Sequence, residues 1–351
     1  MEIEQVVADN ESDYESVLDT AANSTFFHSL AYRDHLQLVM RDEPKYFIAY
    51  EDSRPVGALP TFVTRNDEYG NVLNSLPFFG SHGGVLVSSE IDQETRSTAR
   101  SELLSTIKSV AREENCVFST VITSPFEEDT IYQEELDPDY TDSRIGQIKP
   151  LPQSADEETL LYDVEKRCRT AIRKAKKEGV DVTERTCDER IRELLITEHT
   201  KHMEAVGGTP KPPAFFRELE SHFSPNDDFK VYVAEYDNEV VGLLLLFYHQ
   251  QTIEYFTPVT ISEYRDVYPM NYLIYQAMRD GIREGYDTWN FGGTWTTQDG
   301  VYKFKRSFEP IETEYYYFVN QYEDVSELTS LSPDEVVNEY PWFYVLPFDE
   351  L

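Results

Sequence analysis

The sequence predicts an α+β fold of two similar domains, each a mixed, mostly antiparallel sheet flanked by helices. First, residues 45–60 align with residues 230–245 at a constant offset of 185 residues. Second, each copy is followed by a helical pattern and then a strand pattern. Third, a length of 351 residues suggests two domains of roughly 150 residues each. Two hairpin, helix and strand units therefore favour two related domains over one large sheet.

Each copy of the repeat predicts a β-hairpin. A strand pattern leads into a turn at Asp52-Ser53 in the first copy and at Asp237-Asn238 in the second, and the next strand opens at Val-Gly. The positions identical in both copies are Lys45/Lys230, Ala49/Ala234, Asp52/Asp237, Val56/Val241, Gly57/Gly242 and Leu59/Leu244. Matching at these positions indicates a repeated structural unit.

Each hairpin is followed by a predicted helix and a predicted strand. Residues 93–114 place apolar side chains at helical spacing before a strand over 117–122. Residues 269–285 form the corresponding helix before a strand over 288–291. The apolar positions of the first helix are Leu103, Leu104, Ile107, Val110 and Ala111.

Two acidic segments lie outside these units. Residues 126–142 contain eight acidic and no basic side chains, with Pro138 among them, and we expect a solvated loop that closes the first domain. Residues 321–351 are also acidic, but they end in the aromatic sequence 341–348. We expect this tail to dock onto a domain, with a partner contact as the alternative.

The overall charge narrows the classes of partner. With 66 acidic and 31 basic side chains the chain carries a formal charge of −35, which argues against broad coating of nucleic acid or anionic membrane. A hydrophobic content of 40% excludes general disorder. The acidity is typical of proteins in concentrated salt, so we expect a high-salt cytosol, with binding of a cationic partner as the alternative.

Cysteines and apolar runs indicate a cytoplasmic protein without metal or membrane insertion. Cys116, Cys168 and Cys187 have no metal-ligand spacing and read as reduced thiols. The first residues lack a basic region and an apolar core, and the longest apolar run, 240–248, covers about half a bilayer. We therefore expect no signal peptide and no transmembrane helix.

A basic segment stands out against the acidic background. Residues 166–177 hold seven Lys or Arg and no acid. On a helix, the buried stripe consists of Cys168, Ala171, Ile172 and Ala175, and a neighbouring face of Arg169, Arg173 and Lys176. This face is either a solvated basic surface or a site for phosphates on a nucleotide, a lipid carrier or an RNA end. Without interleaved aromatic residues, the segment favours neither RNA nor small phosphates.

A second pattern places one charge in an apolar stripe. If Asp299 caps a helix, Val301, Phe304, Lys305 and Phe308 share a face. Because a buried unpaired ammonium is costly, Lys305 must extend to solvent, pair or serve a site.

Five motifs in order resemble the Fem-type transferases, the FemAB-like branch of the GNAT superfamily. They are residues 25–29 (TFFHS), 169–180 (RTAIRKAKKEGV), the helix 269–285, 290–293 (NFGG) and 304–308 (FKRSF). The resemblance covers about residues 20–320. It implies tandem GNAT-like domains over 1–150 and 151–320, with 321–351 as the tail and the active site in the second domain.

The resemblance also implies N-acyl transfer to an amine of an anionic, phosphate-bearing acceptor, without a covalent intermediate. The donor is aminoacyl-tRNA or acyl-CoA, each a co-substrate and neither a tightly bound cofactor. In Fem-type enzymes the matching lysine, here Lys305, lies near the reacting centre, and a cation matched by Arg169 or Arg173 lies near substrate phosphates. Residues 265–271 contain no glycine that would let backbone amides approach a pyrophosphate, which favours tRNA.

We hypothesise roles for the remaining candidates on this basis. Lys305 stabilises the developing oxyanion or the leaving group, and Asn290 and Tyr302 act beside it. Arg169, Arg173 and Lys176 bind phosphates, and Tyr255 and Phe304 contact substrate. No carboxylate stands out as a general base, and substrate assistance would make one unnecessary. The alternatives are an acyl-CoA-dependent GNAT N-acetyltransferase of envelope or glycan biosynthesis, and a non-catalytic module that binds a phosphorylated precursor.

Overall fold

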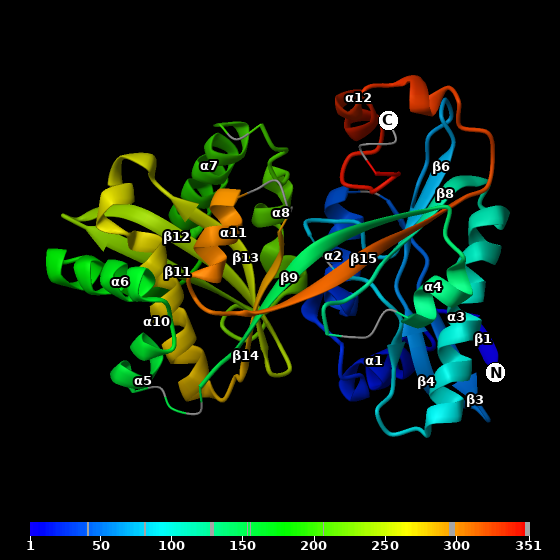
Figure 1. The fold of residues 1–351 in the computed structure, drawn as a ribbon, viewed down its shortest axis with the longest axis horizontal. Helices are drawn as coiled ribbons and strands as arrows, with labels where there is room; N and C mark the ends of the chain where they lie inside the picture. Colours follow the sequence, from blue (N-terminus) through cyan, green and yellow to red (C-terminus); the bar gives the residue numbers. More distant parts are fainter. Residues whose placement is uncertain are drawn as a thin grey trace. The chain divides into compact units, whose positions relative to one another are not determined.

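The computed structural model describes residues 1–40, 42–80, 82–126, 130–152, 154, 156–205, 207–294 and 299–347. The chain divides into two compact units, which are Met1–Arg144 with Glu314–Leu351, and Ile145–Thr313 (Figure 1). This division differs from the expected one. The boundary follows Arg144 instead of residue 150, and the C-terminal residues belong to unit 1 because β15 (Ile311–Gln321) pairs there with β8 (Cys116–Ile122).

Unit 1 holds two groups of strands. Strands β1, β3, β4 and β7 form an antiparallel sheet, and β15, β8, β6, β5 and β2 are neighbours in a second. Apart from β8 and β15, whose bounds are given above, the elements of unit 1 are β1 (Glu2–Gln5), α1 (Glu11–Thr20), α2 (Leu30–Met40), β2 (Glu43–Pro44), β3 (Phe47–Glu51), β4 (Arg54–Leu59), β5 (Phe62–Thr64), β6 (Asn71–Asn74), β7 (Leu86–Val87), α3 (Gln93–Glu113), α4 (Thr130–Leu136) and α12 (Pro333–Glu339), with short 3₁₀ turns at Phe26–His28 and Leu328–Ser330.

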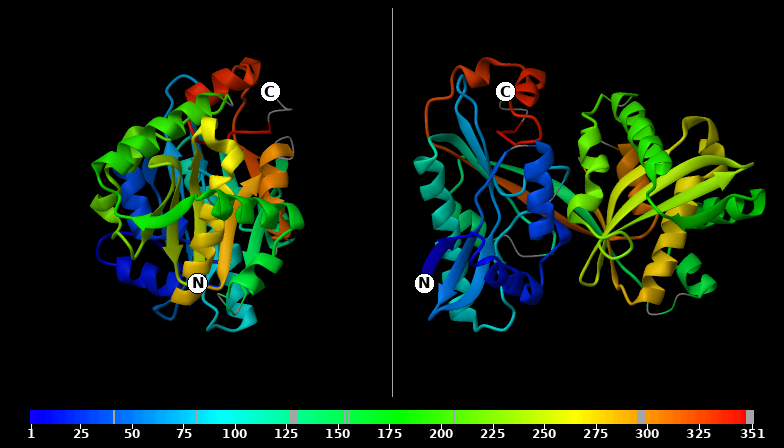
Figure 2. Two further views of the ribbon diagram at one scale, coloured as in Figure 1. Left: turned by 90° about the vertical axis from the view of Figure 1, so that its left-hand side faces the viewer. Right: turned by 180° about the vertical axis from the view of Figure 1, so that it is seen from behind.

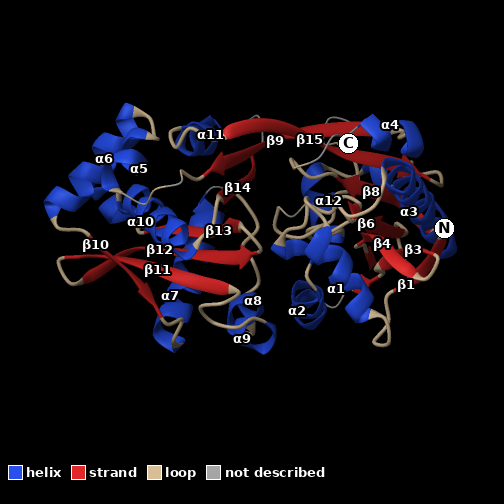
Figure 3. Cartoon of the chain, turned by 90° about the horizontal axis from the view of Figure 1, so that it is seen from below, coloured by secondary structure: helices blue, strands red, loops and turns tan. Residues whose placement is uncertain are grey.

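Unit 2 is built on one mixed sheet in the order β10, β11, β12, β13, β14, β9. Its elements are β9 (Tyr140–Pro150, which begins in unit 1), α5 (Glu157–Tyr162), α6 (Lys166–Glu178), β10 (Asp181–Arg185), α7 (Glu189–Ala205), α8 (Pro213–Arg217), α9 (Leu219–His222), β11 (Phe229–Tyr236), β12 (Glu239–His249), β13 (Thr252–Thr260), α10 (Pro269–Glu284), β14 (Thr288–Thr294) and α11 (Asp299–Arg306), with a 3₁₀ segment at Ser262–Val267. Helices α6 and α10 cover one face of the sheet and α7 lies against the other (Figure 3).

The internal repeat is confirmed in detail. In both hairpins, β3–β4 and β11–β12, the two turn residues have positive φ, with 48° and 65° at Asp52-Ser53 and 51° and 64° at Asp237-Asn238. Such turns match the twist of the flanking strands. A register shift follows Ala49 in the first copy and Ala234 in the second, which are equivalent positions.

The repeat extends to the helix behind each hairpin. A Cβ added at Gly57 would lie 3.1 Å from Cδ1 of Leu103 on α3, and one added at Gly242 would lie 3.1 Å from Cδ1 of Leu273 on α10. In both units the missing side chain therefore lets the helix approach the sheet.

The acidic segment 126–142 is not the loop that we expected. Residues 127–129 lie outside the described part, but residues 130–136 form α4. Tyr132 and Leu136, one turn apart, are fully buried, and the Tyr132 hydroxyl accepts a hydrogen bond from the Val85 amide at 2.7 Å. One apolar stripe is enough to pack this acidic helix against α3.

The C-terminal segment packs on unit 1, where Figures 1 and 2 show it in red. The Tyr340 hydroxyl donates to the Gly70 carbonyl at 2.7 Å, and the Phe343 ring lies 5.5 Å from that of Phe78. The Tyr344 hydroxyl donates to Asp142 at 2.7 Å. Residues 348–351, which include the last aromatic residue of the tail, lie outside the described part.

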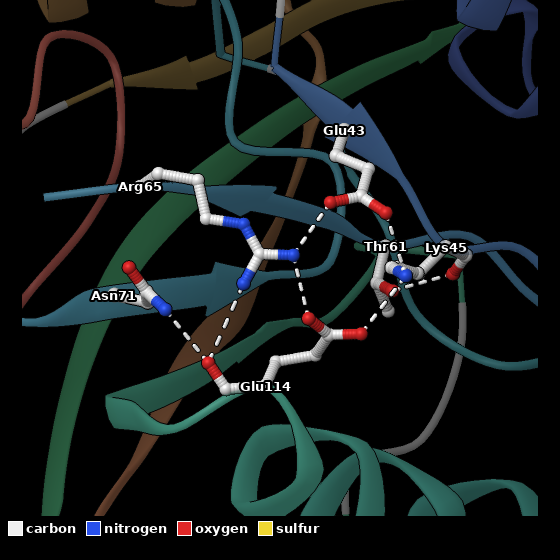
Figure 4. A network of polar contacts seen from close by, with 6 residues as sticks. All are labelled: Glu43, Lys45, Thr61, Arg65, Asn71 and Glu114. Atoms are coloured by element: carbon white, nitrogen blue, oxygen red, sulfur yellow. Dashed lines mark hydrogen bonds and ion pairs between the residues drawn. The ribbon is translucent and has the colours of Figure 1, made fainter.

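A charge network ties the end of α3 to the sheet of unit 1 (Figure 4). Lys45 contacts Glu43 at 2.6 Å and Glu114 at 2.8 Å, and Arg65 contacts the same two carboxylates at 2.5 Å. Hydrogen bonds from Lys45 and then Arg65 lower the pKa of Glu43 and of Glu114.

In the described part of the chain, no helix is long and apolar enough to cross a bilayer.

Candidate functional site

Two neighbouring strands of unit 2 separate part-way along their length. Parallel β13 and β14 pair only from Thr252 with Thr288 to Glu254 with Asn290, although both strands continue. Three buried polar side chains, Glu254, Thr257 and Asn290, lie at or just beyond the last pair. Buried polar groups are costly in a sheet interior unless they are hydrogen-bonded, and each of these three side chains has a buried atom without a partner among the described residues. Because such groups concentrate at functional sites, this opening is a candidate site.

The motif 290–293 forms a bulge at this opening. The β14–β9 register shifts between Asn290 and Gly293, and Asn290 Oδ1 accepts a hydrogen bond from the Gly292 amide at 2.8 Å. Gly292 has φ 70°, which a side chain would strain. The asparagine and the glycine therefore fix the path of the chain toward Thr294.

Lys305 is attached to the end of this bulge. Its Nζ donates to the Gly293 carbonyl and to Thr294 Oγ1, both at 3.0 Å, and only 6% of the residue is exposed. Burial lowers the pKa of this ammonium to about 7. Of the outcomes that the sequence left open, Lys305 is thus paired with neutral oxygens and does not extend into solvent.

Tyr302 belongs to the same polar network. Thr294 Oγ1 donates to Gln147 Oε1 at 3.3 Å, and Gln147 Nε2 donates to Glu312 Oε1 at 3.1 Å. The Tyr302 hydroxyl donates to the other oxygen of Glu312 at 3.0 Å. Lys305 and Tyr302 are therefore linked through β9 and β15, not through the helix that carries both.

Glu254 is the functional candidate that sequence reasoning missed. It is 2% exposed, its Oε1 has no hydrogen-bond partner among the described residues, and Asn290 is its cross-strand neighbour. Burial raises the pKa of Glu254 to about 8, although the Asn290 amide acts in the opposite direction. The available signal was a single acid within the strand sequence 253–259, which is otherwise uncharged.

A cavity of about 410 Å³ lies between α6, α10 and α11, and we call it the α6 pocket. Among the described residues, its cations are Arg167, Lys174 and Lys303, and no acidic side chain lines it. Lys174 Nζ donates to the Asp266 carbonyl at 2.9 Å and lies 3.7 Å from Glu178. Arg167 and Lys303 form ion pairs with Glu165 and Asp299, neither of which lines the pocket. The pocket thus suits a phosphate-bearing group.

The predicted phosphate ligands Arg169, Arg173 and Lys176 do not line this pocket. The guanidinium groups of Arg169 and Arg173 lie 4.8 and 5.9 Å from the ring centre of Tyr162, and Lys176 Nζ lies 4.6 Å from that of Tyr275. Periodicity predicted the buried stripe of α6 correctly. It could not decide which flanking face meets a cavity, because that depends on the neighbouring helices.

Two exposed tyrosines stand beside the cations of α6. Tyr162, at the end of α5, is 63% exposed, and the ring of Tyr268, just before α10, lies 4.9 Å from Lys174 Nζ. The fold therefore supplies the interleaved aromatic residues that the segment 166–177 lacks. We call Tyr162, Arg169 and Arg173 together the Tyr162 face.

The last two candidates divide between the pocket and the core. Phe304 lines the α6 pocket, whereas its neighbour Lys305 faces β14, so α11 lies between the pocket and the bulge. Tyr255 contacts Trp289 and Phe291 at ring distances of 6.1 and 5.4 Å and packs on the main cluster of unit 2. Burial raises the pKa of the Tyr255 hydroxyl.

The segment that carries this site matches a known family. Residues 163–306, from α6 to α11, match the model of the acetyltransferase (GNAT) domain. Unit 2 is built on a GNAT domain. The segment 163–306 is accordingly an acyltransferase domain, and this match confirms the resemblance drawn from the motifs at the level of the GNAT domain. No curated protein matches the chain.

Solved structures share the fold across both units. FemX is 13% identical with a TM-score of 0.69, over 91% of this chain and 97% of that one. A tandem GNAT protein from the clavulanic acid biosynthesis pathway is 11% identical with a TM-score of 0.58, over 92% and 99%. The C-terminal domain of a putative lysylphosphatidylglycerol synthetase from Agrobacterium fabrum is 11% identical with a TM-score of 0.54, over 94% and 96%. At these identities the likeness concerns the fold, and it confirms the predicted tandem GNAT architecture.

Proposed function

We propose that this acyltransferase transfers an aminoacyl group from aminoacyl-tRNA to an amine of a phosphate-bearing acceptor, as a Fem-type enzyme. The observation that carries the choice of donor is that α6 presents two surfaces, the α6 pocket and the Tyr162 face. A pocket of about 410 Å³ accommodates the terminal nucleotide of a donor. The Tyr162 face suits a further base, because tyrosine rings and arginine planes stack bases.

The bulge of β14 supports N-acyl transfer at the adjacent opening. The amine attacks the acyl carbonyl, a C–N bond forms, and the ester C–O bond to the ribose breaks. In its ammonium form Lys305 stabilises the negative charge on the carbonyl oxygen or on the leaving oxygen. The end of β14 that holds its Nζ limits reorganisation during the reaction.

Glu254 is our candidate for the proton that the amine loses. A carboxyl group with a pKa of about 8 is a stronger base than an exposed glutamate, and it exchanges protons near neutral pH. Asn290 lies across the strand pair from it. We assign Asn290 to positioning, because its oxygen is engaged by the Gly292 amide. Tyr302, bonded to Glu312, is assigned to the same positioning network.

An acyl-CoA donor is the second candidate, supported by the α6 pocket alone. The Tyr268 ring and the cations Lys174 and Arg167 would suit an adenosine diphosphate group. Binding of this donor would not require contacts with the Tyr162 face. The soluble location in a high-salt cytosol inferred from the charge remains part of the proposal.

Binding measurements on variants distinguish the two donors. Fluorescence anisotropy with an aminoacylated acceptor-stem hairpin, and calorimetry with acetyl-CoA, should be run on Arg167→Gln/Lys174→Gln and on Tyr162→Ala. An RNA donor requires both variants to weaken hairpin binding, with roughly a 10-fold loss for Tyr162→Ala. Acetyl-CoA binding that is tight and sensitive only to the pocket variant would favour the second candidate. Lys201→Ala, an exposed lysine on α7 paired with Glu198, is the control.

A further inference from the structure

Lys305 is joined to the surface of unit 2 by a chain of side-chain hydrogen bonds. Lys305 Nζ donates to Thr294 Oγ1 at 3.0 Å, and the Thr294 hydroxyl donates to Gln147 Oε1 at 3.3 Å. Gln147 Nε2 donates in turn to Glu312 Oε1 at 3.1 Å. Lys305, Thr294 and Gln147 are buried, whereas Glu312 is exposed. The chain of hydrogen bonds therefore begins at a carboxylate in water and ends at a buried lysine.

The order of donors along these hydrogen bonds is dictated by the exposed end. A carboxylate only accepts hydrogen bonds, so Gln147 must turn its NH₂ group toward Glu312 and its oxygen toward Thr294. An amide oxygen also only accepts, so the single hydroxyl hydrogen of Thr294 is used on Gln147. Toward Lys305, the Thr294 oxygen then has only lone pairs to offer. Each step leaves the next side chain one orientation.

A lone pair at Thr294 favours a charged lysine. The Gly293 carbonyl, the second partner of Lys305 Nζ at 3.0 Å, is likewise an acceptor. Two acceptors suit an ammonium group, which has three hydrogens and no lone pair. They hold two of its N–H bonds and leave the third for a further acceptor. This third bond is the one that the proposed function requires at the reacting oxygen.

An amide in place of the Glu312 carboxylate would remove this constraint. Two facing amides can pair in either of two orientations, because each has both donors and an acceptor. When the NH₂ group of Gln147 faces Thr294, the hydroxyl oxygen accepts from it, and the hydroxyl hydrogen is free to turn toward Lys305. An ammonium cannot accept that hydrogen, so this orientation favours the neutral amine.

Other titratable side chains on α11 and on the elements that meet it have partners of their own. They are Asp299 with Lys303, Tyr302 with Glu312 and Arg306, Glu165 with Arg167, Lys149 with Asp163, and Glu254 with Asn290. Burial lowers the pKa of Lys305 to about 7. A change in one of its hydrogen bonds therefore alters its charge near neutral pH.

We propose that Glu312 is a positioning residue, which fixes the donor order through Gln147 and Thr294 and so keeps Lys305 in the form that donates to the reacting oxygen. Glu312 acts over three hydrogen bonds and does not need to touch the substrate. Its effect on transfer rests on the function proposed above for Lys305, but the donor order itself does not.

Titration of lysine signals by NMR tests the donor order without a substrate. The protein is labelled with ¹³C at the lysine Cε, and the Lys305 signal is assigned through Lys305→Arg. In Glu312→Gln this signal should titrate at lower pH than in the wild type by roughly one pH unit, the size of one hydrogen bond to a charged group.

An exchange of the two side chains should reverse this effect. In Gln147→Glu/Glu312→Gln a carboxylate again accepts from Thr294, and the amide now at the surface donates to that carboxylate. The titration midpoint of Lys305 should return to the wild-type value or rise above it. A merely structural role of Glu312 would not predict this recovery.

Glu309→Gln is the matched control, because it removes one negative charge from an exposed position just after α11. It should leave the Lys305 midpoint unchanged. An unchanged midpoint in Glu312→Gln would overturn the proposal, as would an equal fall in Glu309→Gln. Because Glu312 is exposed, we expect Glu312→Gln to fold, and thermal unfolding checks this.

Transfer rates separate this proposal from the function on which it rests. If both hold, the fall of kcat at alkaline pH should begin at lower pH in Glu312→Gln, by the same amount as the lysine midpoint, and recover in the exchange variant. Donor affinity should not change, because Glu312 does not line the α6 pocket. A midpoint that moves while the kcat profile stays in place would support the donor order and overturn the catalytic role of Lys305.

Discussion

Lys305 Nζ donates a hydrogen bond to the carbonyl oxygen of Gly293 at 3.0 Å. This contact joins the last turn of α11 to the bulge of β14, two segments that the sequence presents as separate motifs. Because Asn290 and Gly292 shape the same bulge, the lysine, the asparagine and the glycines form one structural unit. The position of the charge therefore depends on the path of β14.

Replacing Lys305 should separate catalysis from binding. Lys305→Ala removes the proposed stabilisation of the oxyanion, and we expect kcat to fall by roughly 100-fold to 1,000-fold, with donor affinity nearly unchanged because Lys305 does not line the α6 pocket. Single-turnover transfer followed by mass spectrometry measures the rate. Lys303→Ala, two residues away in the pocket, should show the opposite pattern, and full activity of a folded Lys305→Ala would contradict the assignment.

The pH dependence of transfer should reflect two buried groups. The carboxylate of Glu254 predominates above its pKa of about 8, so its contribution rises with pH. The ammonium of Lys305 predominates below its pKa of about 7, so its contribution falls with pH. The rate should pass through a narrow maximum between these values, where only a minority of molecules carry both active forms.

Variants identify which group produces each limb of this profile. Glu254→Gln should lose the acidic limb together with most of the rate, and Lys305→Arg, whose side chain stays charged, should lose the alkaline limb. Profiles with both limbs unchanged in these variants would show that other groups titrate.

The bulge itself should be sensitive to a single methyl group. Gly292→Ala forces a side chain into a backbone with φ 70°, and we expect a loss of about 1–2 kcal/mol of unfolding free energy. Transfer activity should fall as well, because Gly293 and Thr294 would shift. Gly300→Ala, where a Cβ meets no atom within 4 Å, carries the same chemical change and should leave stability unchanged or slightly higher.

Salt titrations should count the phosphate contacts of the α6 pocket. If Arg167 and Lys174 neutralise phosphates of an RNA donor, log K falls with log salt. Removing each cation should then make this negative slope less steep by about 0.7. Fluorescence anisotropy at several KCl concentrations gives the slope for each variant. An unchanged slope in Arg167→Gln/Lys174→Gln would place the phosphates elsewhere.

Stability should rise with salt concentration. The charge of −35 opposes compaction through repulsion between acidic side chains. Salt screens this repulsion, whose range shortens as the Debye length falls to about 3 Å at 1 M salt. We expect the midpoint of thermal unfolding to increase with KCl, although the network of Glu43, Lys45, Arg65 and Glu114 should weaken slightly. A midpoint that falls steadily would argue against adaptation to high salt.

The sequence by itself determined the repeat, the hairpins and the buried stripe of α6. These features follow from local rules: alternation in strands, helical spacing, and turn residues that accept positive φ. Local rules also singled out Lys305, since a lone charge in an apolar stripe is visible in the sequence.

Only the tertiary structure decided which side chains meet. The pocket uses Arg167 and Lys174 in place of Arg169 and Arg173 because α10 and α11 cover one flank of α6. Tyr268 comes to α6 from a segment distant in the sequence, whereas Tyr162 precedes α6 directly at the end of α5. Glu254 becomes a candidate because β13 is buried where it separates from β14. Burial and the distances between remote segments set charge, pKa and access, and neither is encoded in the periodicity of one segment.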